Sequence, residues 1–439
     1  MHSTVDCDVL VIGGGPAGSS AATMLARKGW RVLLLEKDRH PRFHIGESLL
    51  PCNLPIFEQL GVLEMVSELG VLKLGADFPA GEGNYQTFHF RRALGNSPPH
   101  AFQVKREDFD RMLFEHARES GVDAREQVKV EEVSAAGIGA VNAQARDADG
   151  NTLGINARYL VDASGRDTVL GNKLKLKRKN DKHQSAAIFA HFLDVERRPG
   201  DDAGNISIYN FAHGWCWFIP LPDGVMSVGC VCWPDYLKQR KGDNDGFLIN
   251  TLKLMPDAWS RMQHARMTGD VRVTGNYSYT CARMGGPGWI MAGDAWAFVD
   301  PVFSSGVYLA MHGGTRAAEV VDGSLRDPRR EAPLQRAFAR RVQRGVRVFS
   351  WFIYRFNSPV MRGLFAHPRN YFRVEDGVIS MLAGDVFESR PVMLRVYLFR
   401  LLYATAGILS WRRWLADLGQ RRRQARAEFS GGTTPVDPA

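Results

Sequence analysis

The sequence predicts an α/β protein in which a parallel sheet of the doubly wound type is joined by a second, mostly antiparallel sheet and a helical C-terminal region. Three observations predict this fold class. Residues 9–35 have the pattern of a strand, a glycine turn, a helix and a second strand. Residues 183–275 contain short runs in which apolar residues recur near period 2. Residues 331–355 have the pattern of a basic, amphipathic helix. No internal repeat interrupts this order.

The N-terminal segment has the pattern of a Rossmann-like βαβ unit. The apolar run 9–12 is followed by Gly13-Gly14-Gly15-Pro16-Ala17-Gly18, a predicted helix over 19–28 and a strand over 31–35. Gly13 allows a sharp turn, Gly15 leaves room for a pyrophosphate against the backbone, and Gly18 lets helix and strand pack closely. The amide groups at the helix start would face the phosphates.

Glu36 ends the second strand of this unit. An acid at this position is placed to accept hydrogen bonds from a ribose diol, which favours an adenosine 2′-OH over a 2′-phosphate. It does not distinguish FAD from NAD. The alternative is an ordinary glycine-rich turn, but strand, helix and acid stand in the register that dinucleotide binding requires.

Length and composition describe an ordinary globular protein. The chain has 439 residues, a length for which two or three structural units are expected. Its composition, 45% hydrophobic and 23% charged, is typical of a globular protein. The six cysteines lack metal-ligand spacing, so we expect reduced thiols, no metal site and a cytoplasmic protein without a signal peptide. The net charge of +9 gives solubility or attracts an acidic partner, and no nucleic-acid motif accompanies it.

Domain limits follow from these changes in pattern. We expect a discontinuous nucleotide-binding domain (1–180 and 276–330), a β-sheet substrate domain (181–275), a helical region (331–420) and a disordered tail (421–439). Within the helical region, 392–415 is apolar and aromatic but carries arginines, two of them well inside the run. A buried or surface-lying amphipathic helix is therefore expected rather than a spanning one, with peripheral membrane contact as the sharper interpretation.

Three separated motifs together resemble the single-FAD-domain flavoprotein monooxygenases over residues 1 to about 380. These are the glycine turn at 13–18, Asp162-Ala163-Ser164-Gly165-Arg166, and Gly293-Asp294. The resemblance implies an FAD-binding domain of the glutathione-reductase/monooxygenase type with an inserted substrate sheet. The cofactor-binding residues that we expect on this basis are Gly13, Gly15, Ala17, Gly18, Glu36, Glu47, Arg106 and Asp294. Arg106 precedes a helix and could bind phosphate, or form a surface salt bridge to Asp110.

Within that superfamily, further motifs are similar to those of flavin-dependent halogenases. Trp215-Cys216-Trp217-Phe218-Ile219-Pro220 matches their WxWxIP pattern, Lys73-Leu74-Gly75-Ala76 resembles the segment with their essential lysine, and 300–307 resembles their halide-adjacent loop. The loop 41–51, with Gly46-Glu47-Ser48, is also typical. Size and spacing resemble the phenol and pyrrole halogenases more than the tryptophan enzymes.

The resemblance implies a halogenation reaction. Reduced FAD from a separate flavin reductase, O₂ and chloride or bromide would yield hypohalous acid, which passes through an internal channel to a lysine, beyond which an electron-rich ring is halogenated. The channel protects protein and flavin from a reactive product. Phenol, resorcinol, pyrrole and aryl polyene precursors are candidate substrates, and whether the ring is free or tethered to an acyl carrier protein is open.

Each functional residue has a plainer interpretation. Ser305 and Gly306 would offer successive amides to a halide, or form a tight turn before a helix. Lys73 would act on hypohalous acid, its pKa lowered by burial, or lie at the surface. Trp215 and Trp217 share one face of a strand that Pro220 ends, and they would line the tunnel with Ile219 or pack in the core. The substrate base is not assigned; the candidates are His44, Glu47, Tyr308 and His312.

Two functional alternatives remain from the sequence. One is a halide-independent relative of the same fold: a hydroxylase, an epoxidase or a geranylgeranyl-reductase-like enzyme. The other is a catalytically silent flavoprotein that serves as a membrane-associated scaffold, suggested by the arginine-rich aromatic stretch at 392–415.

Overall fold

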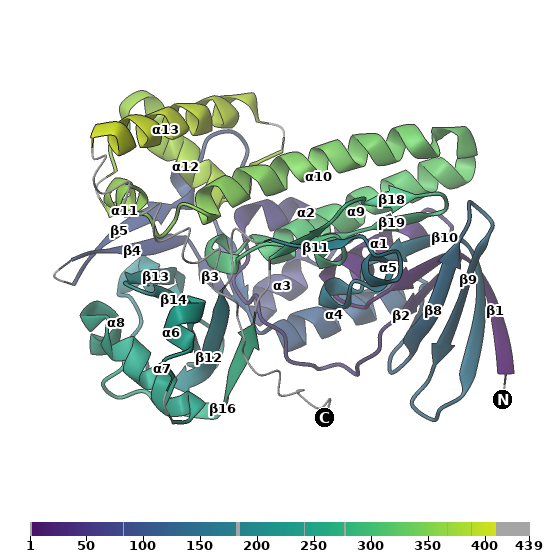
Figure 1. The fold of residues 1–439 in the computed structure, drawn as a ribbon, viewed down its shortest axis with the longest axis horizontal. Coiled ribbons are helices and arrows are strands. Elements are labelled where there is room, and N and C mark those ends of the chain that lie inside the picture. Colours follow the sequence, from purple (N-terminus) through teal and green to yellow (C-terminus); the bar gives the residue numbers. More distant parts are fainter. Residues whose placement is uncertain are drawn as a thin grey trace.

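A mostly parallel sheet centred on β1 (His2–Ile12) frames the nucleotide-binding part of the molecule, at the right of Figure 1. β1 lies between β2 (Val32–Leu35) and β10 (Thr152–Asp162), parallel to both. The order continues outward through β7 (Asp123–Arg125) on one side and through β19 (Trp289–Met291) and β18 (Gly285–Gly286) on the other. β8 (Lys129–Ala135) and β9 (Val141–Arg146) extend β10 as antiparallel strands. The computed structural model describes residues 2–81, 83–180, 185–240, 242–275, 278–366, 368–387 and 389–409.

Three helices cover this sheet and confirm the predicted βαβ unit. α1 (Pro16–Ala26) begins directly after the glycine turn, with Pro16 at its first position, and packs against α9 (Ser305–Arg326) and α4 (Arg106–Glu119). The close approach depends on Gly18, because a Cβ there would lie 1.8 Å from the Gly13 carbonyl oxygen. α2 (Leu54–Leu60) and α3 (Leu63–Leu69) follow, separated by Gly61 in the left-handed region.

The second sheet has seven strands and is antiparallel except for one pair. Its order is β16 (Arg266–Gly275), β12 (Ala186–Leu193), β15 (Met226–Cys232), β14 (Gly214–Pro220), β13 (Ile206–Phe211), β4 (Gly75–Gly81) and β5 (Asn84–His89). β13 and β4 are the parallel pair. β4 and β5 thus bring residues 75–89 into the sheet. Smaller sheets join β3 (Gly70–Lys73) to β6 (Ala101–Val104), and β11 (Lys177–Lys179) to β17 (Tyr279–Cys281) and β20 (Ala297–Phe298).

The strand-like prediction for 183–275 is wrong between 234 and 260, where the chain forms α6 (Pro234–Leu237), α7 (Asn244–Lys253) and α8 (Pro256–Ser260). Prolines stand at the first position of α6 and α8, and the Asp243 side chain caps α7 by accepting from the Gly246 amide at 2.7 Å. These local start signals outweigh the strand-like apolar pattern of the surrounding sequence.

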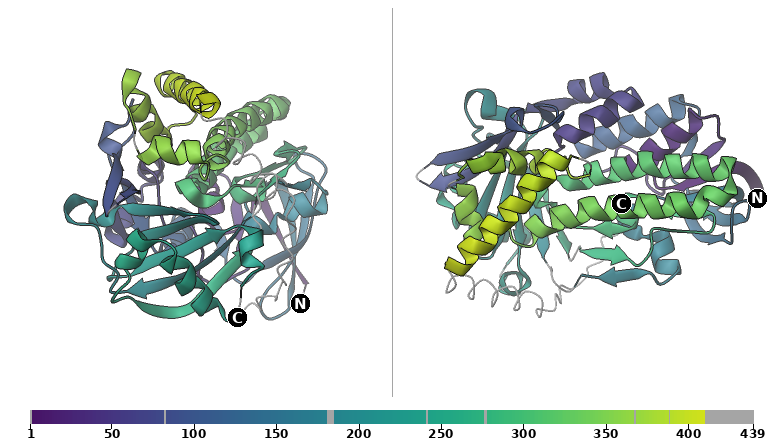
Figure 2. Two further views of the ribbon diagram at one scale, coloured as in Figure 1. Left: turned by 60° about the vertical axis from the view of Figure 1, so that its left-hand side comes forward. Right: turned by 90° about the horizontal axis from the view of Figure 1, so that it is seen from above.

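The described part of the C-terminal region forms the helices α10 (Glu331–Ile353), α11 (Pro359–Ala366), α12 (Val374–Leu382) and α13 (Arg390–Leu409). α10 runs beside α9, and α13 packs on α12 and α11. Seen from above, α13 lies on the outer side of the molecule (Figure 2). The predicted tail at 421–439, and residues 410–420 of the predicted helical region, lie outside the described residues.

The expectation of six free thiols is wrong for one pair. Cys216 on β14 and Cys230 on β15 are directly opposite in the strand register and form a disulfide. The sequence separation of 14 residues gives no sign of this pairing, because it depends on how two adjacent strands align. Among the described residues, the free cysteines are Cys7, Cys52, Cys232 and Cys281.

Substituting Gly18→Ala tests whether close packing of α1 on β1 holds the glycine turn in place. The new methyl group would collide with backbone, so we expect a loss of roughly 1–3 kcal/mol in unfolding free energy together with weaker retention of flavin. Chemical denaturation and flavin absorbance measure both. Gly363→Ala, at an exposed and unobstructed position of α11, serves as the control and should be neutral or slightly stabilising. Unchanged stability and flavin content in Gly18→Ala would contradict the packing argument.

Candidate functional site

A cavity of about 700 Å³ opens where β1, β2 and β10 end and α1 begins. The carboxyl ends of parallel strands are where open α/β sheets bind ligands. Predicted site residues that line the cavity are Gly13, Gly15, Ala17, Glu36, Glu47, Arg106, Trp215, Trp217, Ile219, Asp294 and Gly306. The structure therefore brings together residues that are up to 293 positions apart in the chain.

The glycine turn forms an open cradle at one end of this cavity. Gly13 has a φ of 100°, a conformation that other residues rarely adopt, and a Cβ at Gly15 would project toward open space with only the Arg42 guanidinium 3.7 Å away. The Glu36 carboxylate is buried and accepts from the Gly14 amide at 2.7 Å. Its second oxygen accepts from the Asp38 amide, so the acid is held rigidly at the end of β2.

This arrangement fits the adenosine and pyrophosphate portions of FAD. The unobstructed cradle at Gly15, the amides at the start of α1 and the fixed acid at Glu36 match the three parts of the dinucleotide that such a motif binds. Gly18 does not line the cavity and acts instead through helix–strand packing. Pocket volume and chemistry thus agree with a bound dinucleotide.

Arg106 is committed to a protein carboxylate. Its guanidinium donates to both carboxylate oxygens of Asp110, at 2.8 and 3.0 Å, and to the Ile45 carbonyl at 2.7 Å. The pair is buried, which corrects the alternative of a surface salt bridge. Arg42 donates to Asp110 and Glu36 at 3.2 and 3.3 Å, and these two cations hold the pKa of Asp110 below its usual value despite burial.

Two further acids organise the cavity wall. Asp162 is fully buried, and it accepts from the Ser164 and Leu170 amides, which fixes the turn after β10. Asp294 lines the cavity next to Gly293, and burial raises its pKa to about 6. A carboxyl group with that pKa changes protonation near neutrality, so its hydrogen-bonding role toward a ligand hydroxyl would vary with pH.

One face of β14 forms an aromatic wall of the cavity. Trp215, Trp217 and Ile219 belong to the same hydrophobic cluster, whereas Cys216 and Phe218 pack in a different cluster on the other side of the sheet. The predicted alternation is confirmed. The Trp217 indole donates to Ser227 at 3.1 Å, which fixes its orientation, and the strand ends at Pro220 as expected.

Lys73 is the most unusual charged group of the site. Its side chain is 1% exposed, and its Nζ donates to the Ser48 hydroxyl at 2.8 Å and to the Leu49 carbonyl at 2.9 Å. No acidic side chain in the described part of the chain forms an ion pair with it, and burial lowers the pKa of Lys73 to about 7. The interpretation as a plain surface lysine is wrong.

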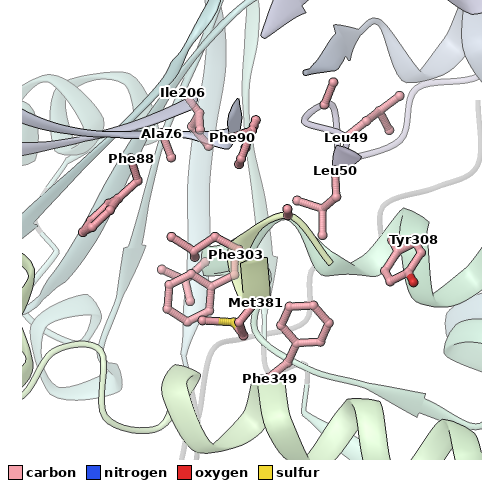
Figure 3. Packing of buried hydrophobic residues seen from close by; sticks show 14 of the residues in the cluster. Leu49, Leu50, Ala76, Phe88, Phe90, Ile206, Phe303, Tyr308, Phe349 and Met381 are labelled. Carbon is pink, nitrogen blue, oxygen red and sulfur yellow. The ribbon is translucent and has the colours of Figure 1, made fainter. Parts of the chain in front are cut away.

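Lys73 lies between the cavity and an apolar cluster. Ser48, its hydrogen-bond partner, lines the cavity, while Lys73 itself does not. On the other side, Nζ is 5.3 Å from the centroid of Phe90. Figure 3 shows Phe90 with Leu49, Leu50, Phe303 and Tyr308 in the apolar cluster that the C-terminal helices complete.

The start of α9 presents backbone amides beside the cavity. Ser304 has a φ of 55° and precedes the helix, and Gly306 lines the cavity. Ser305 is fully buried, and its hydroxyl has no hydrogen-bond partner among the described residues. Free amides in the first turn of a 22-residue helix, at the edge of the cavity of about 700 Å³, suit a small anion.

Of the four candidate bases, two line the cavity and two do not. Glu47 and His44 line the cavity; Glu47 pairs with His191 at 2.7 Å, and burial lowers the pKa of His44 to about 4. Tyr308 and His312 lie on α9, away from the cavity lining. His312 stacks on Phe387 at 4.0 Å, and burial lowers its pKa to about 3, so it is neutral at physiological pH.

Sequence reasoning missed several residues of the site. Arg42, Ser48 and His191 each contact a predicted site residue, and none of the three was given a role from the sequence. Ser48 and His191 contact partners that are 25 and 144 positions away, so no local pattern indicates these contacts. Among the described residues, no group of three or more His, Cys, Asp or Glu side chains could hold a metal ion.

Comparison with known proteins places this site in a family. Residues 6–351 match the FAD binding domain family. The chain is 33% identical to flavin-dependent halogenase rdc2 of Metacordyceps chlamydosporia over 376 residues, which covers 80% of this chain and 71% of that protein. A flavoprotein/dehydrogenase from Cytophaga hutchinsonii superposes with a TM-score of 0.85 at 26% identity, covering 92% of this chain and 100% of that one. The myxobacterial chondrochloren halogenase superposes with a TM-score of 0.75 at 31% identity, with 90% and 96% covered.

The fold and the cavity define an FAD-binding flavoprotein. The chain belongs to the flavin-dependent halogenases. Its cofactor is FAD and its co-substrate is a halide. Enzymes of this family act on small aromatic substrates and need a flavin reductase. When bound here, FAD would supply the redox chemistry with O₂, and the residues that line the cavity would hold it.

Asp110→Asn tests the buried charge cluster beside the cavity. Loss of the carboxylate leaves Arg106 and Arg42 without their shared counter-ion in a buried setting, so we expect a loss of roughly 3–5 kcal/mol in unfolding free energy and weaker flavin retention. Denaturant titration and flavin absorbance measure these changes. Asp108→Asn, on the same helix but in a solvent-exposed pair with Arg111, should change stability by less than about 1 kcal/mol. Equal effects of the two variants would contradict the assignment.

Proposed function

We propose that this halogenase delivers hypohalous acid from the flavin cavity past Ser48 to Lys73, where an electron-rich aromatic ring is halogenated. The observation that carries the proposal is the position of Lys73. It is buried, has no carboxylate partner among the described residues, and is one hydrogen bond away from the cavity lining. A charge kept in that setting carries a cost that a purely structural lysine would not need.

We assign Lys73 a proton-donor role. An ammonium group has three N–H donors, and Ser48 and Leu49 accept from two of them. The third can donate to the oxygen of hypohalous acid. As the ring carbon forms its bond to the halogen, the halogen–oxygen bond breaks, the oxygen takes the lysine proton, and water leaves. The proton released by the ring restores the ammonium group.

The halide would bind at the start of α9. The amides of Ser305 and Gly306, with the helix dipole behind them and the free Ser305 hydroxyl nearby, supply the donors that chloride or bromide needs. Trp215 and Trp217 would keep the ring away from the flavin. They line the cavity and belong to the apolar cluster beside it, and bulky side chains at that position would favour halogenation over direct oxygen transfer.

The substrate we propose is a neutral, electron-rich ring of the phenol, resorcinol, pyrrole or aryl polyene type. The side of Lys73 away from the cavity is apolar and aromatic, which suits a neutral ring better than a charged amino acid. Tethering to an acyl carrier protein is a further part of this proposal, supported by the net charge of +9 and the acidic character of a phosphopantetheine-bearing partner.

An isotope-resolved assay tests the function. FAD-loaded enzyme, a flavin reductase, NADH and O₂ are incubated with a panel of free phenols and pyrroles and with one carrier-tethered pyrrole, in chloride, bromide or neither. We expect a halide-dependent isotope pattern that Lys73→Met abolishes while flavin content is kept. Lys105→Met, at a lysine paired with exposed Asp223, is the matched control. A mass gain of one oxygen that ignores halide would indicate a hydroxylase instead.

The pH dependence of stability separates a functional lysine from a structural one. The folded pKa of about 7 lies below the unfolded value of about 10.4, so the folded state carries the full cost of a buried charge below pH 7 and sheds it as pH rises toward 10.4. We expect Lys73→Met to melt several degrees higher than the wild type at pH 6, with a smaller difference at pH 9. Calorimetry over this range measures it. A variant that is less stable at pH 6 would show that Lys73 serves the fold.

A further inference from the structure

Helix α13 (Arg390–Leu409) has two apolar faces, and only one of them is covered. Its inner face packs Val392, Val396, Phe399 and Tyr403 into the hydrophobic cluster of the C-terminal region. Its outer face exposes a stripe of large apolar side chains: Leu394 (56% exposed), Tyr397 (58%), Leu401 (60%) and Ile408 (73%). Positions 394, 397, 401 and 408 follow the helical period, so the stripe extends along about 21 Å of helix, with Ala404 and Thr405 in the turn between Leu401 and Ile408.

Arginines lie to both sides of the stripe, with Arg400 at its border and Arg395 nearer the packed inner face. At about 100° per residue, Arg395 lies roughly 130° to one side of the centre of the stripe, and Arg400 lies roughly 90° to the other. The Arg400 guanidinium stacks over Trp351 at 4.9 Å and over Tyr397 at 5.5 Å. The Nε atoms of both arginines are buried without a hydrogen-bond partner in the described residues, and the Arg395 guanidinium also donates to the Pro391 carbonyl at 3.2 Å. Long basic side chains on the shoulders of an apolar stripe can extend to phosphate groups while their stems cover apolar surface.

The charge of this segment has one sign. Residues 389–416 contain five arginines and no aspartate or glutamate. The sequence after the described helix continues as Trp411-Arg412-Arg413-Trp414. Tryptophan and arginine are the residues that concentrate at the boundary between lipid headgroups and acyl chains.

We propose that α13 lies flat on an anionic lipid bilayer, with the stripe of Leu394, Tyr397, Leu401 and Ile408 in the headgroup–acyl boundary and the flanking arginines on lipid phosphates. α13 is long and apolar enough to cross a membrane, the one helix of which this is true among the described residues. The inner face of α13 is packed on the protein, however, and Arg395 and Arg400 interrupt the apolar sequence of the helix. A helix held on one side by its own domain presents its other side to a surface instead of spanning it.

A second copy of the chain fits this face less well. Pairing two α13 helices about a two-fold axis would bring arginine shoulders together with no acid on the segment to neutralise them. The stripe is also a narrow surface beside the roughly 800 Å² that each partner contributes to a standard interface. An anionic bilayer supplies both the apolar depth and the opposite charge.

Vesicle flotation of the full-length, FAD-loaded protein tests this. The probes are vesicles of phosphatidylcholine with phosphatidylglycerol at three to one, and vesicles of phosphatidylcholine alone. We expect flotation with the anionic vesicles, reduced by high salt, and a much smaller bound fraction with the neutral ones. The double variant Leu394→Glu/Leu401→Glu should reduce the bound fraction at least about tenfold, because two anchoring side chains become anionic.

The control is Leu254→Glu, which alters a similarly exposed leucine (53%) on the loop between α7 and α8 and should float like the wild type. Flavin absorbance and melting temperature should be unchanged in all variants, because every substituted side chain is exposed. No flotation of the wild type, or equal flotation of the double variant, would overturn the proposal. A dimer seen by light scattering and dissociated by the double variant would assign the face to a second copy. If the wild type binds an acidic carrier protein and the double variant does not, the exposed face of α13 would be assigned to that partner. Either result would replace the bilayer as the occupant of this face.

Discussion

The burial of one uncompensated amino group is the constraint around which this structure is arranged. Lys73 ends β3, which pairs with β6 and is followed directly by β4 of the second sheet. Its Nζ therefore sits where the loop with Ser48 and Leu49 meets the start of the second sheet. Two hydrogen bonds to Ser48 and Leu49 satisfy the group in part, and no counter-ion offsets its charge in the described residues. Proteins keep such a group where its altered protonation serves chemistry.

The surrounding elements divide the molecule into two compartments at this point. On one side, the glycine cradle, Glu36 and the start of α9 form a polar cavity suited to a dinucleotide and a small anion. On the other side, aromatic and aliphatic side chains from α9 to α12 form a dry cluster. The face of β14 that carries Trp215 and Trp217 lies between the cavity and the apolar cluster. Because side chains alternate along a strand, the Cys216–Cys230 disulfide lies on the opposite face. Under the proposed function, this separation would let a reactive acid form in one compartment and act in the other.

Sequence alone predicted the parts of this arrangement that depend on local chemistry. The βαβ unit, the glycine cradle, Glu36 and the facing of Trp215 and Trp217 follow from short-range patterns, and the structure confirms them. The pairing of Arg106 with Asp110, four residues along the same helix, was considered from the sequence, but its burial was not; the partner of Glu47 did not follow, because His191 is brought to it by packing between distant elements. The helices at 234–260 were missed where capping residues outweighed apolar content. The catalytic and halide-binding roles stay predictions, since they concern ligands rather than the fold.

The protonation of Lys73 is the central claim, and direct titration tests it. Protein labelled with ¹³C at the lysine Cε positions would be followed by NMR from pH 5 to 11, with the Lys73 resonance identified by its absence in Lys73→Met. We predict a midpoint near 7, set by burial without a carboxylate. A midpoint near the ordinary value of about 10.4 would contradict the account, because an amino group with that pKa is solvated or paired with an acid.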